Sequence, residues 1–376
     1  MIQVWIVLAL FVPFGVFAQS VPIPAPPQLG VKSYVLMDSS TGQIIAESSP
    51  DEILEPASLT KLMTAYAAFK ALEQGQISLD DEVYVSEKAW RTDGSRMFIE
   101  VDTYVTVEDL FRGMIIQSGN DASVALSEHV AGSEDAFVGL MNQYAQLLGM
   151  SSSSFRNSTG LPETDHYTTA RDTATLTRAI IAEFPAYYSW YSEREFTYND
   201  ITQPNRNSLL WRDTSVDGLK TGYTDAAGYC LVTSAERSDM RLISVVMGAN
   251  SPEARATNSQ AILNYGFRFY ETHKLYSGRE EITTSRVWMG EPGSVSMGVT
   301  QDLFLTIPRG SFDSLTSSID LSTDLIAPLE MNSPVGVIRV TLEGENVSEV
   351  PLVTLHEVPE AGLWTRLKDQ VMLWAQ

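Results

Sequence analysis

A serine and a lysine that could act together in catalysis, Ser58 and Lys61, stand three residues apart in the segment 56–61, Pro-Ala-Ser-Leu-Thr-Lys. Its leading proline predicts the start of a helix, and this spacing puts both side chains on one helix face. Because a serine hydroxyl is a weak nucleophile, it needs a base beside it. Lys61 can be that base when burial and a nearby cation such as Lys220 keep it neutral. Taken alone, the pair also fits Ser58 as an ordinary helix N-cap.

Two further motifs follow, Ser118-Gly119-Asn120 between two predicted helices and Lys220-Thr221-Gly222 on a predicted strand. Motifs of these types in this chain order are typical of penicilloyl serine transferases. Ser118 can pass a proton from Lys61 to a departing amine. The amide of Asn120 can hold a substrate peptide bond and orient Lys61. The three motifs together therefore predict an acyl-transfer site.

The strand motif also predicts how a substrate is held. A free carboxylate needs a cation and a hydroxyl donor, which Lys220 and Thr221 can supply, and the strand edge can pair with an extended peptide. Gly222 leaves room where substrate must pass. Two backbone N–H groups, those of Ser58 and Tyr223, are the expected donors to the developing oxyanion.

The elements that must position these residues follow from turn signals and periodicity. Residues 34–46 predict a β-hairpin, and apolar residues at helical spacing predict a helix over 56–72. Further helices are expected over 106–116, 121–131 and about 173–182, followed by strands over 216–224, 228–235 and 241–247. Antiparallel strands around a helical block indicate a sheet with helices packed on it, an α/β (α+β) arrangement.

Beyond about residue 273 the pattern changes to short alternating runs separated by Gly, Pro and Ser, which predicts a small all-β domain. We therefore expect a first domain over 19–272, an all-β domain over 273–360 and a terminal helix over 361–376. That helix has Leu363, Leu367, Val371 and Trp374 on one side. It could lie in a membrane interface, or it could dock on the β domain.

Composition limits the possible functions. The chain has 376 residues and a formal charge of -22, which opposes binding to nucleic acid. Its single cysteine, Cys230, excludes an intrachain disulfide, and the four histidines lack metal-ligand spacing, so no metal or other cofactor is expected. Residues 1–18 form an uncharged apolar stretch that predicts a signal peptide, with an uncleaved anchor as the alternative.

The sequence closely resembles the low-molecular-mass penicillin-binding proteins of the serine D-alanyl-D-alanine carboxypeptidase family. The resemblance is carried by segments 55–64, 118–122, 167–172, 217–224, 266–269 and 306–310. It implies a transpeptidase/β-lactamase-like domain, a β-sandwich-like domain and a terminal amphipathic helix on the outer face of the inner membrane.

The same resemblance implies the reaction. The terminal D-Ala of a peptidoglycan pentapeptide stem is removed through an acyl-enzyme on Ser58, and penicillins acylate the same serine. Arg255 matches the family's arginine near the substrate carboxylate, within a segment that we expect to be a loop. Family members often carry His where Tyr223 stands, so a side-chain role at that position does not carry over.

Three other functions are compatible with part of this pattern. A serine β-lactamase would share the nucleophile, but segment 157–163 lacks the context of a class A glutamate loop, and the β domain would be superfluous. A non-catalytic wall-binding protein would not need Ser58, Lys61, Ser118 and Lys220. A D,D-endopeptidase is the nearest alternative, against which the β domain and the tail favour a carboxypeptidase.

Overall fold

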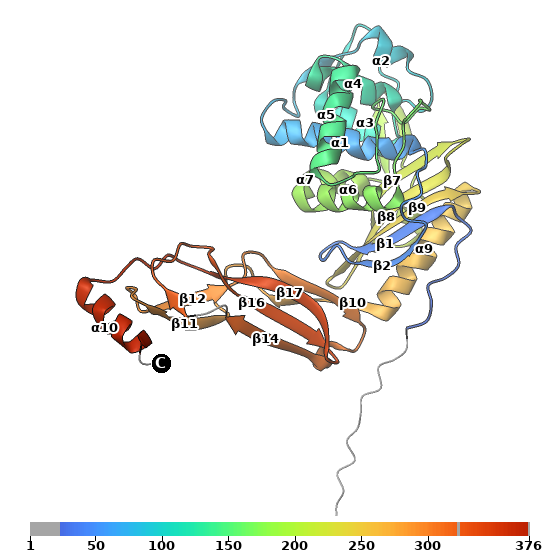
Figure 1. Cartoon of the computed structure of the whole chain (residues 1–376). Helices are drawn as coiled ribbons and strands as arrows, with labels where there is room; N and C mark the ends of the chain where they lie inside the picture. The colour runs from blue at the N-terminus through green and yellow to red at the C-terminus, as the bar shows by residue number, and fades with distance from the viewer. Residues whose placement is uncertain (1–22, 322–323, 375–376) are drawn as a thin grey trace, which may run out of the picture.

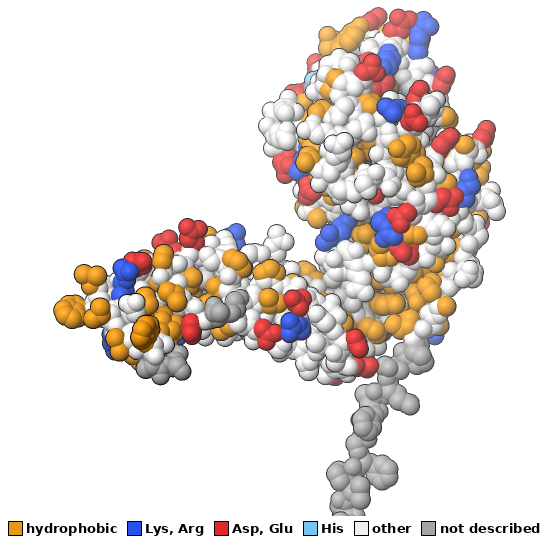
Figure 2. Space-filling view, in the orientation of Figure 1, with side chains coloured by type: hydrophobic (Ala, Val, Ile, Leu, Met, Phe, Trp, Pro, Cys, Tyr) orange, Lys and Arg blue, Asp and Glu red, His pale blue; other side chains and the backbone are white. Residues whose placement is uncertain are grey.

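The computed structural model describes residues 23–321 and 324–374. The predicted signal peptide over 1–18 lies outside these residues. Two lobes make up the described chain: a larger one with helices around a sheet, and a smaller, elongated one built of strands (Figure 1). Figure 2 shows that the lobes meet at a narrow junction. The predicted fold class, a sheet with packed helices followed by an all-β domain, is confirmed.

The larger lobe is built on a five-stranded antiparallel sheet. Its order is β2 (Ile44–Ser48), β1 (Ser33–Asp38), β9 (Met240–Ala249), β8 (Gly228–Arg237) and β7 (Val216–Thr224). All four neighbouring pairs are antiparallel. The predicted hairpin and the three predicted strands are therefore present, and β7 lies at one edge of the sheet.

Both faces of this sheet are buried. Val35 and Val245 belong to a core shared with the main group of helices, whereas Leu36 and Val246 belong to a second core. The second core is closed by α9 (Pro252–Phe269), which packs on β9 and β8. Strands that are buried on both faces have nearly continuous apolar sequences, and β9 has such a sequence.

The other face carries the helices that surround the catalytic motifs. They are α1 (Thr60–Glu73), α2 (Glu87–Arg91), α3 (Val107–Ile116), α4 (Asn120–Ala131), α5 (Glu134–Leu147) and α6 (Ala170–Glu183). The predicted start of α3 is confirmed, because the Thr106 hydroxyl accepts from the Asp109 N–H at 3.1 Å. Gly132 ends α4 with a φ of 78°.

Short elements complete this lobe. They are η1 (Ala57–Leu59), β3 (Glu82–Tyr84), β4 (Tyr104–Thr106), α7 (Pro185–Tyr188), η2 (Ser189–Ser192), β5 (Glu195–Tyr198), β6 (Ile201–Pro204) and α8 (Leu209–Arg212). The predicted helix over 56–72 thus begins with a 3₁₀ turn, η1, before it continues as α1.

The smaller lobe begins with β10 (Tyr270–Tyr276), which follows α9 directly and starts slightly before residue 273. β10 pairs with β13 (Leu303–Pro308). The remaining strands form a sheet in the order β14 (Leu315–Leu321), β16 (Pro334–Leu342), β17 (Glu345–Thr354), β12 (Ser294–Gly298), β11 (Thr283–Trp288) and β15 (Leu325–Ile326). A short 3₁₀ turn, η3 (Phe312–Ser314), precedes β14.

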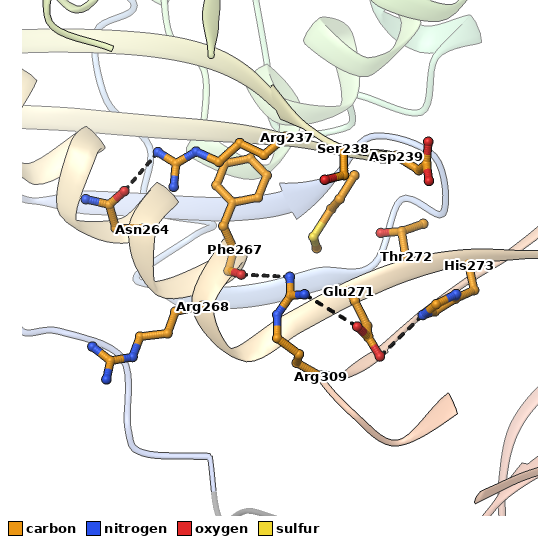
Figure 3. A pocket seen from close by; sticks show the side chains of 11 residues that line it. Arg237, Ser238, Asp239, Asn264, Phe267, Arg268, Glu271, Thr272, His273 and Arg309 are labelled. Carbon is orange, nitrogen blue, oxygen red and sulfur yellow. Dashed lines mark hydrogen bonds and ion pairs between the residues drawn. The ribbon is translucent and has the colours of Figure 1, made fainter. Parts of the chain in front are cut away.

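Polar contacts tie the two lobes together beside a cavity of about 390 Å³ (Figure 3). The Arg309 guanidinium donates to the carbonyls of Phe267 and Tyr270, each at 2.9 Å, and so caps the end of α9 from the smaller lobe. The Thr41 and Thr306 hydroxyls are 2.7 Å apart, and the Thr272 hydroxyl donates to Asp38. Two segments of the family resemblance, 266–269 and 306–310, therefore meet at this junction.

Candidate active site

The Ser58 turn is the first feature of the site. Ser58 lies in η1, after Ala57, which has a φ of 48°, a value that non-glycine residues rarely adopt. Lys61 follows in the first turn of α1 and is 1% exposed. Its Nζ lies 3.1 Å from the Ser58 Oγ. The predicted nucleophile and base are therefore within hydrogen-bond distance of each other.

Two further contacts orient the Lys61 amine. The Nζ donates to the Asn120 Oδ1 at 2.6 Å and to the Thr159 carbonyl at 2.6 Å. Both partners can only accept, so a neutral amine spends its two N–H bonds on them. Its lone pair is then left facing the Ser58 hydroxyl, which is the arrangement that a general base requires.

Burial and nearby charges set the protonation of Lys61. Burial lowers the pKa of Lys61 from 10.5 to about 7, and the Arg206 charge acts in the same direction, while Asp121 opposes it. The predicted neutral lysine is thus accessible near neutral pH. The neighbouring cation that acts most strongly on it is Arg206, and not Lys220 as we expected.

Ser118 lies in the connection between α3 and α4, and Asn120 is the first residue of α4. Ser118 has a φ of 67°, and its buried Oγ has no hydrogen-bond partner within the described residues. Asn120 orients Lys61 as predicted, while its Nδ2 donates to the Asp93 carbonyl at 2.5 Å. One N–H bond of this amide is therefore occupied by the protein and only the other is left for substrate.

β7 forms the opposite wall of the site. Gly222 lies so close to the nucleophile that an added Cβ would sit 3.2 Å from the Ser58 nitrogen. Lys220 is 2% exposed and donates to the Thr221 carbonyl at 3.2 Å. Burial, and then the charges of Lys61, Arg206 and Arg255, hold the pKa of Lys220 well below 10.5.

These residues surround a cavity of about 290 Å³. Its lining includes Ser58, Ser118, Thr221, Gly222, Tyr223 and Arg255 from the predicted set, and also Ser95, Arg206, Tyr229 and Pro252. Lys61, Asn120 and Lys220 lie behind this wall. The predicted site residues are thus brought together around one cavity, and both lysines are buried.

The expected loop around Arg255 is wrong, because Arg255 lies in the first turn of α9. Ser251 caps this helix, its hydroxyl accepting from the Ala254 N–H at 3.0 Å. Serine followed by proline is a helix-start signal, and it could have been used. The Arg255 guanidinium donates to the Gly222 carbonyl at 3.2 Å and faces the cavity.

Arg206 is a site residue that sequence reasoning missed. It follows β6 and lines the cavity, with no hydrogen-bond or ion-pair partner in residues 23–321 and 324–374. Asn207 fixes the turn, because its Nδ2 donates to the Gly218 carbonyl at 3.0 Å and its Oδ1 accepts from the Leu209 N–H at 3.1 Å. The Asn-Arg-Asn sequence is a turn signal, but it does not predict which site the arginine faces.

Tyr223, the position where family members often carry His, turns its side chain outward. The ring is 49% exposed and stacks on Tyr229 with ring centroids 4.3 Å apart. Its hydroxyl donates to Asp225 at 2.7 Å. The ring therefore forms the rim of the cavity, whereas the backbone continues along β7 beside Gly222.

Comparison with known proteins gives one consistent family. Residues 20–251 match the model described as D-alanyl-D-alanine carboxypeptidase, and residues 270–360 match the C-terminal domain of penicillin-binding protein 5. The D-alanyl-D-alanine carboxypeptidase DacA of Escherichia coli is 43% identical over 93% of this chain and 89% of its own length.

Two solved structures are also similar to this chain in three dimensions. Penicillin binding protein 5 from Haemophilus influenzae is 42% identical and superposes with a TM-score of 0.86, covering 90% of this chain and all of its own. Penicillin-binding protein D2 from Listeria monocytogenes, in an ampicillin-bound form, is 29% identical with a TM-score of 0.60 and covers 65% of this chain and 100% of its own.

Proposed function

Because this chain belongs to the D-alanyl-D-alanine carboxypeptidases, serine peptidases of peptidoglycan metabolism, we propose that Ser58 is the residue acylated in its reaction and Lys61 the general base. The observation that carries this assignment is the position of the Lys61 amine, 3.1 Å from the Ser58 Oγ and bonded to two acceptors. In the neutral amine these acceptors take both N–H bonds, which leaves the lone pair for the Ser58 hydroxyl. Lys61 takes the hydroxyl proton as the Ser58 Oγ attacks the penultimate D-Ala carbonyl.

The later steps use the predicted roles of the remaining groups. The backbone N–H groups of Ser58 and Tyr223 stabilise the oxyanion of the tetrahedral intermediate. When the C–N bond breaks, the proton held by Lys61 passes by way of the Ser118 hydroxyl to the leaving D-Ala amine. Water then attacks the Ser58 ester, with Lys61 as base again, and the shortened stem peptide leaves.

For recognition of the substrate carboxylate, we propose to add Arg206 to the predicted residues. Arg206 and Arg255 both face the cavity, together with the Thr221 hydroxyl, whereas Lys220 lies buried behind it. We propose that these arginines and Thr221 bind the carboxylate. Lys220, which was also predicted to bind it, lies near enough to Arg206 and Arg255 for their charges to lower its pKa, and we propose that it belongs to the same carboxylate site. The open edge of β7 accepts the extended stem peptide by β-pairing.

The test of this function combines intact-mass analysis with product release. We expect incubation with a penicillin to add one penicilloyl group, which peptide mapping assigns to Ser58, and we expect a pentapeptide to release its terminal D-Ala. Rapid penicillin turnover without D-Ala release would favour a β-lactamase. Neither adduct nor release would favour a wall-binding protein, and cleavage of crosslinked dimers in preference to pentapeptide would favour a D,D-endopeptidase.

We further propose that the chain is exported by the signal peptide over 1–18 and acts in the periplasm. The proposed domain limits are 19–272 for the catalytic domain, 273–360 for the β domain and 361–376 for the terminal helix.

The terminal helix, α10 (Leu363–Trp374), is the proposed attachment to the outer face of the inner membrane. One side docks on the β domain, where Asp369 accepts from Arg286 at 3.0 Å and from the Met289 N–H at 2.8 Å. The other side is exposed and apolar, with Trp364 at 85% and Trp374 at 92%, and Figure 2 has apolar side chains gathered at this end of the lobe. Among the described residues no helix is long and apolar enough to cross a membrane.

We expect the double substitution Trp364→Ser with Trp374→Ser to lower binding to phospholipid vesicles by about 10-fold or more, because the two indoles supply much of the apolar area that enters the interface. Co-sedimentation with vesicles measures this. D-Ala release in solution should stay unchanged and serves as the control. Equal vesicle binding by the two proteins would contradict attachment through α10.

A further inference from the structure

The Thr159 carbonyl that accepts from Lys61 belongs to a loop fixed by a carboxylate outside the catalytic motifs. Glu134, the first residue of α5, is 7% exposed. Its Oε1 accepts from the Ser158 N–H at 2.9 Å and from the Ser158 Oγ at 2.7 Å. Resting on the proposed role of Lys61, we propose that Glu134 is a positioning residue, which holds the 157–160 loop so that the Thr159 carbonyl aims the Lys61 amine at Ser58.

The loop is held on two sides around this carbonyl. Glu134 binds the N–H side of Ser158, and the Thr64 hydroxyl of α1 donates to the Ser158 carbonyl at 2.7 Å. The Asn157 Oδ1 accepts from the Gly160 N–H at 2.7 Å. Because a trans peptide is planar, fixing the Gly160 N–H on one side directs the Thr159 carbonyl to the opposite side, toward Lys61.

Glu134 is suited to this task because all its partners favour the ionised form. Lys88 of α2 lies 2.8 Å from the Oε2. Burial opposes the charge, but the bonds from Lys88 and Ser158 outweigh it and lower the pKa of Glu134. The carboxylate also lies at the N-terminus of α5, where a negative charge is favoured. It therefore remains a fixed anchor over the working pH range.

Loss of the Glu134 carboxylate should change the pKa of Lys61 as well as the conformation of the 157–160 loop. When the loop relaxes, water reaches the Lys61 amine, which otherwise faces only Ser58, Asn120 and the Thr159 carbonyl at hydrogen-bond distance. Arg206, Lys220 and Asp121 are the charged groups around Lys61, and they stay in place. Relief of burial then raises the pKa of Lys61, so its base form appears only at higher pH.

The experiment compares Glu134→Ala, Glu134→Gln and Glu128→Gln with the wild-type protein. Glu128 is the matched control, because it also lies near Lys88 but it accepts a hydrogen bond from the Ser86 hydroxyl and not from the loop. The readouts are the second-order rate of Ser58 acylation by a penicillin across pH, the kcat and KM for a D-Ala-D-Ala peptide, and the thermal midpoint.

We expect Glu134→Ala to slow acylation about 10-fold at pH 8. For the D-Ala-D-Ala peptide, the loss should appear in kcat, while KM stays within about twofold of the wild-type value. The acid limb of its pH profile should move to higher pH. Glu134→Gln, which retains an acceptor oxygen for Ser158, should recover most of the rate, and Glu128→Gln should match wild type.

A folded Glu134→Ala protein with wild-type acylation and an unmoved acid limb would overturn the inference. If that variant does not fold, Ser158→Ala replaces it, since this change removes only one of the two bonds to Glu134; we expect about a threefold loss with the same direction of limb shift, and wild-type values would again overturn the inference. Failure of the wild-type protein to acylate at all would instead contradict the proposed function.

Discussion

Replacing Lys61 by methionine is expected to slow acylation of Ser58 by a penicillin about 10³-fold, the middle of the range for loss of a positioned general base. Methionine nearly matches the length of lysine and suits the buried position, where Lys61 is 1% exposed. It cannot accept a proton, and its thioether cannot donate to Asn120 or Thr159. The variant should therefore fold and bind penicillin but acylate Ser58 slowly.

The pH profile separates this cause from general damage. With the pKa of Lys61 lowered to about 7, wild-type acylation should fall as the pH drops through that value, because the ammonium form cannot take the serine proton. The residual rate of Lys61→Met should lack this limb. Stopped-flow measurement with a chromogenic β-lactam gives both profiles. An acylation rate within 10-fold of wild type, or an unchanged limb, would show that another group is the base.

The same substitution has an expected signature in stability. The folded-state pKa of Lys61, about 7, lies below the ordinary 10.5, so between these values the folded protein binds fewer protons than the unfolded chain. The free energy of unfolding therefore rises with pH across this window. Below pH 7, where Lys61 is charged in the folded protein too, burying it destabilises the fold most. Denaturant unfolding should show that Lys61→Met raises the free energy of unfolding, relative to the wild-type protein, by more at pH 6 than at pH 9. A gain that does not depend on pH would contradict the lowered pKa.

Much of the fold could be predicted because local signals agree with the tertiary structure. The strands of the central sheet are buried on both faces, so their apolar runs are long and clear. The helix over 107–116 has its N-cap at Thr106, and the helix over 120–131 ends at a glycine with positive φ. Each such signal depends only on neighbouring residues, which is why sequence reasoning found them.

The parts of the site that sequence did not predict depend on long-range placement. The Thr159 carbonyl is a backbone group, and any residue could supply it. Arg206 reaches the cavity from a turn that has no catalytic motif. Arg255 was predicted from the family resemblance, but its place in a helix required recognition of the capped start after Ser251. Motifs therefore located Ser58, Lys61 and the orienting Asn120, whereas the Thr159 carbonyl and the Arg206 charge became evident only from the folded chain.

The connection between the 157–160 loop and the Ser58 turn leads to the second large expected effect, for Gly160→Ala. Gly160 has a φ of 85°, and an added Cβ would lie 1.8 Å from the Ala57 carbonyl oxygen and 2.9 Å from the Thr60 Oγ1. The carbonyl is backbone, held in the strained residue just before Ser58, so it cannot move without moving the nucleophile. Displacement by about 1 Å would cost about 10²-fold in acylation rate.

Gly132→Ala is the matched control, because Gly132 has a similar φ of 78° but no atom within 4 Å of the added Cβ. Both variants carry the cost of a left-handed alanine, about 1 kcal/mol, and only Gly160→Ala adds the clash. We expect Gly132→Ala to be slightly less stable than wild type, with an unchanged acylation rate by intact-mass time courses. Equal losses of rate in both variants would mean that general destabilisation, and not displacement of Ser58, explains the effect. A folded Gly160→Ala protein that acylates normally would mean that the loop and the nucleophile turn move independently.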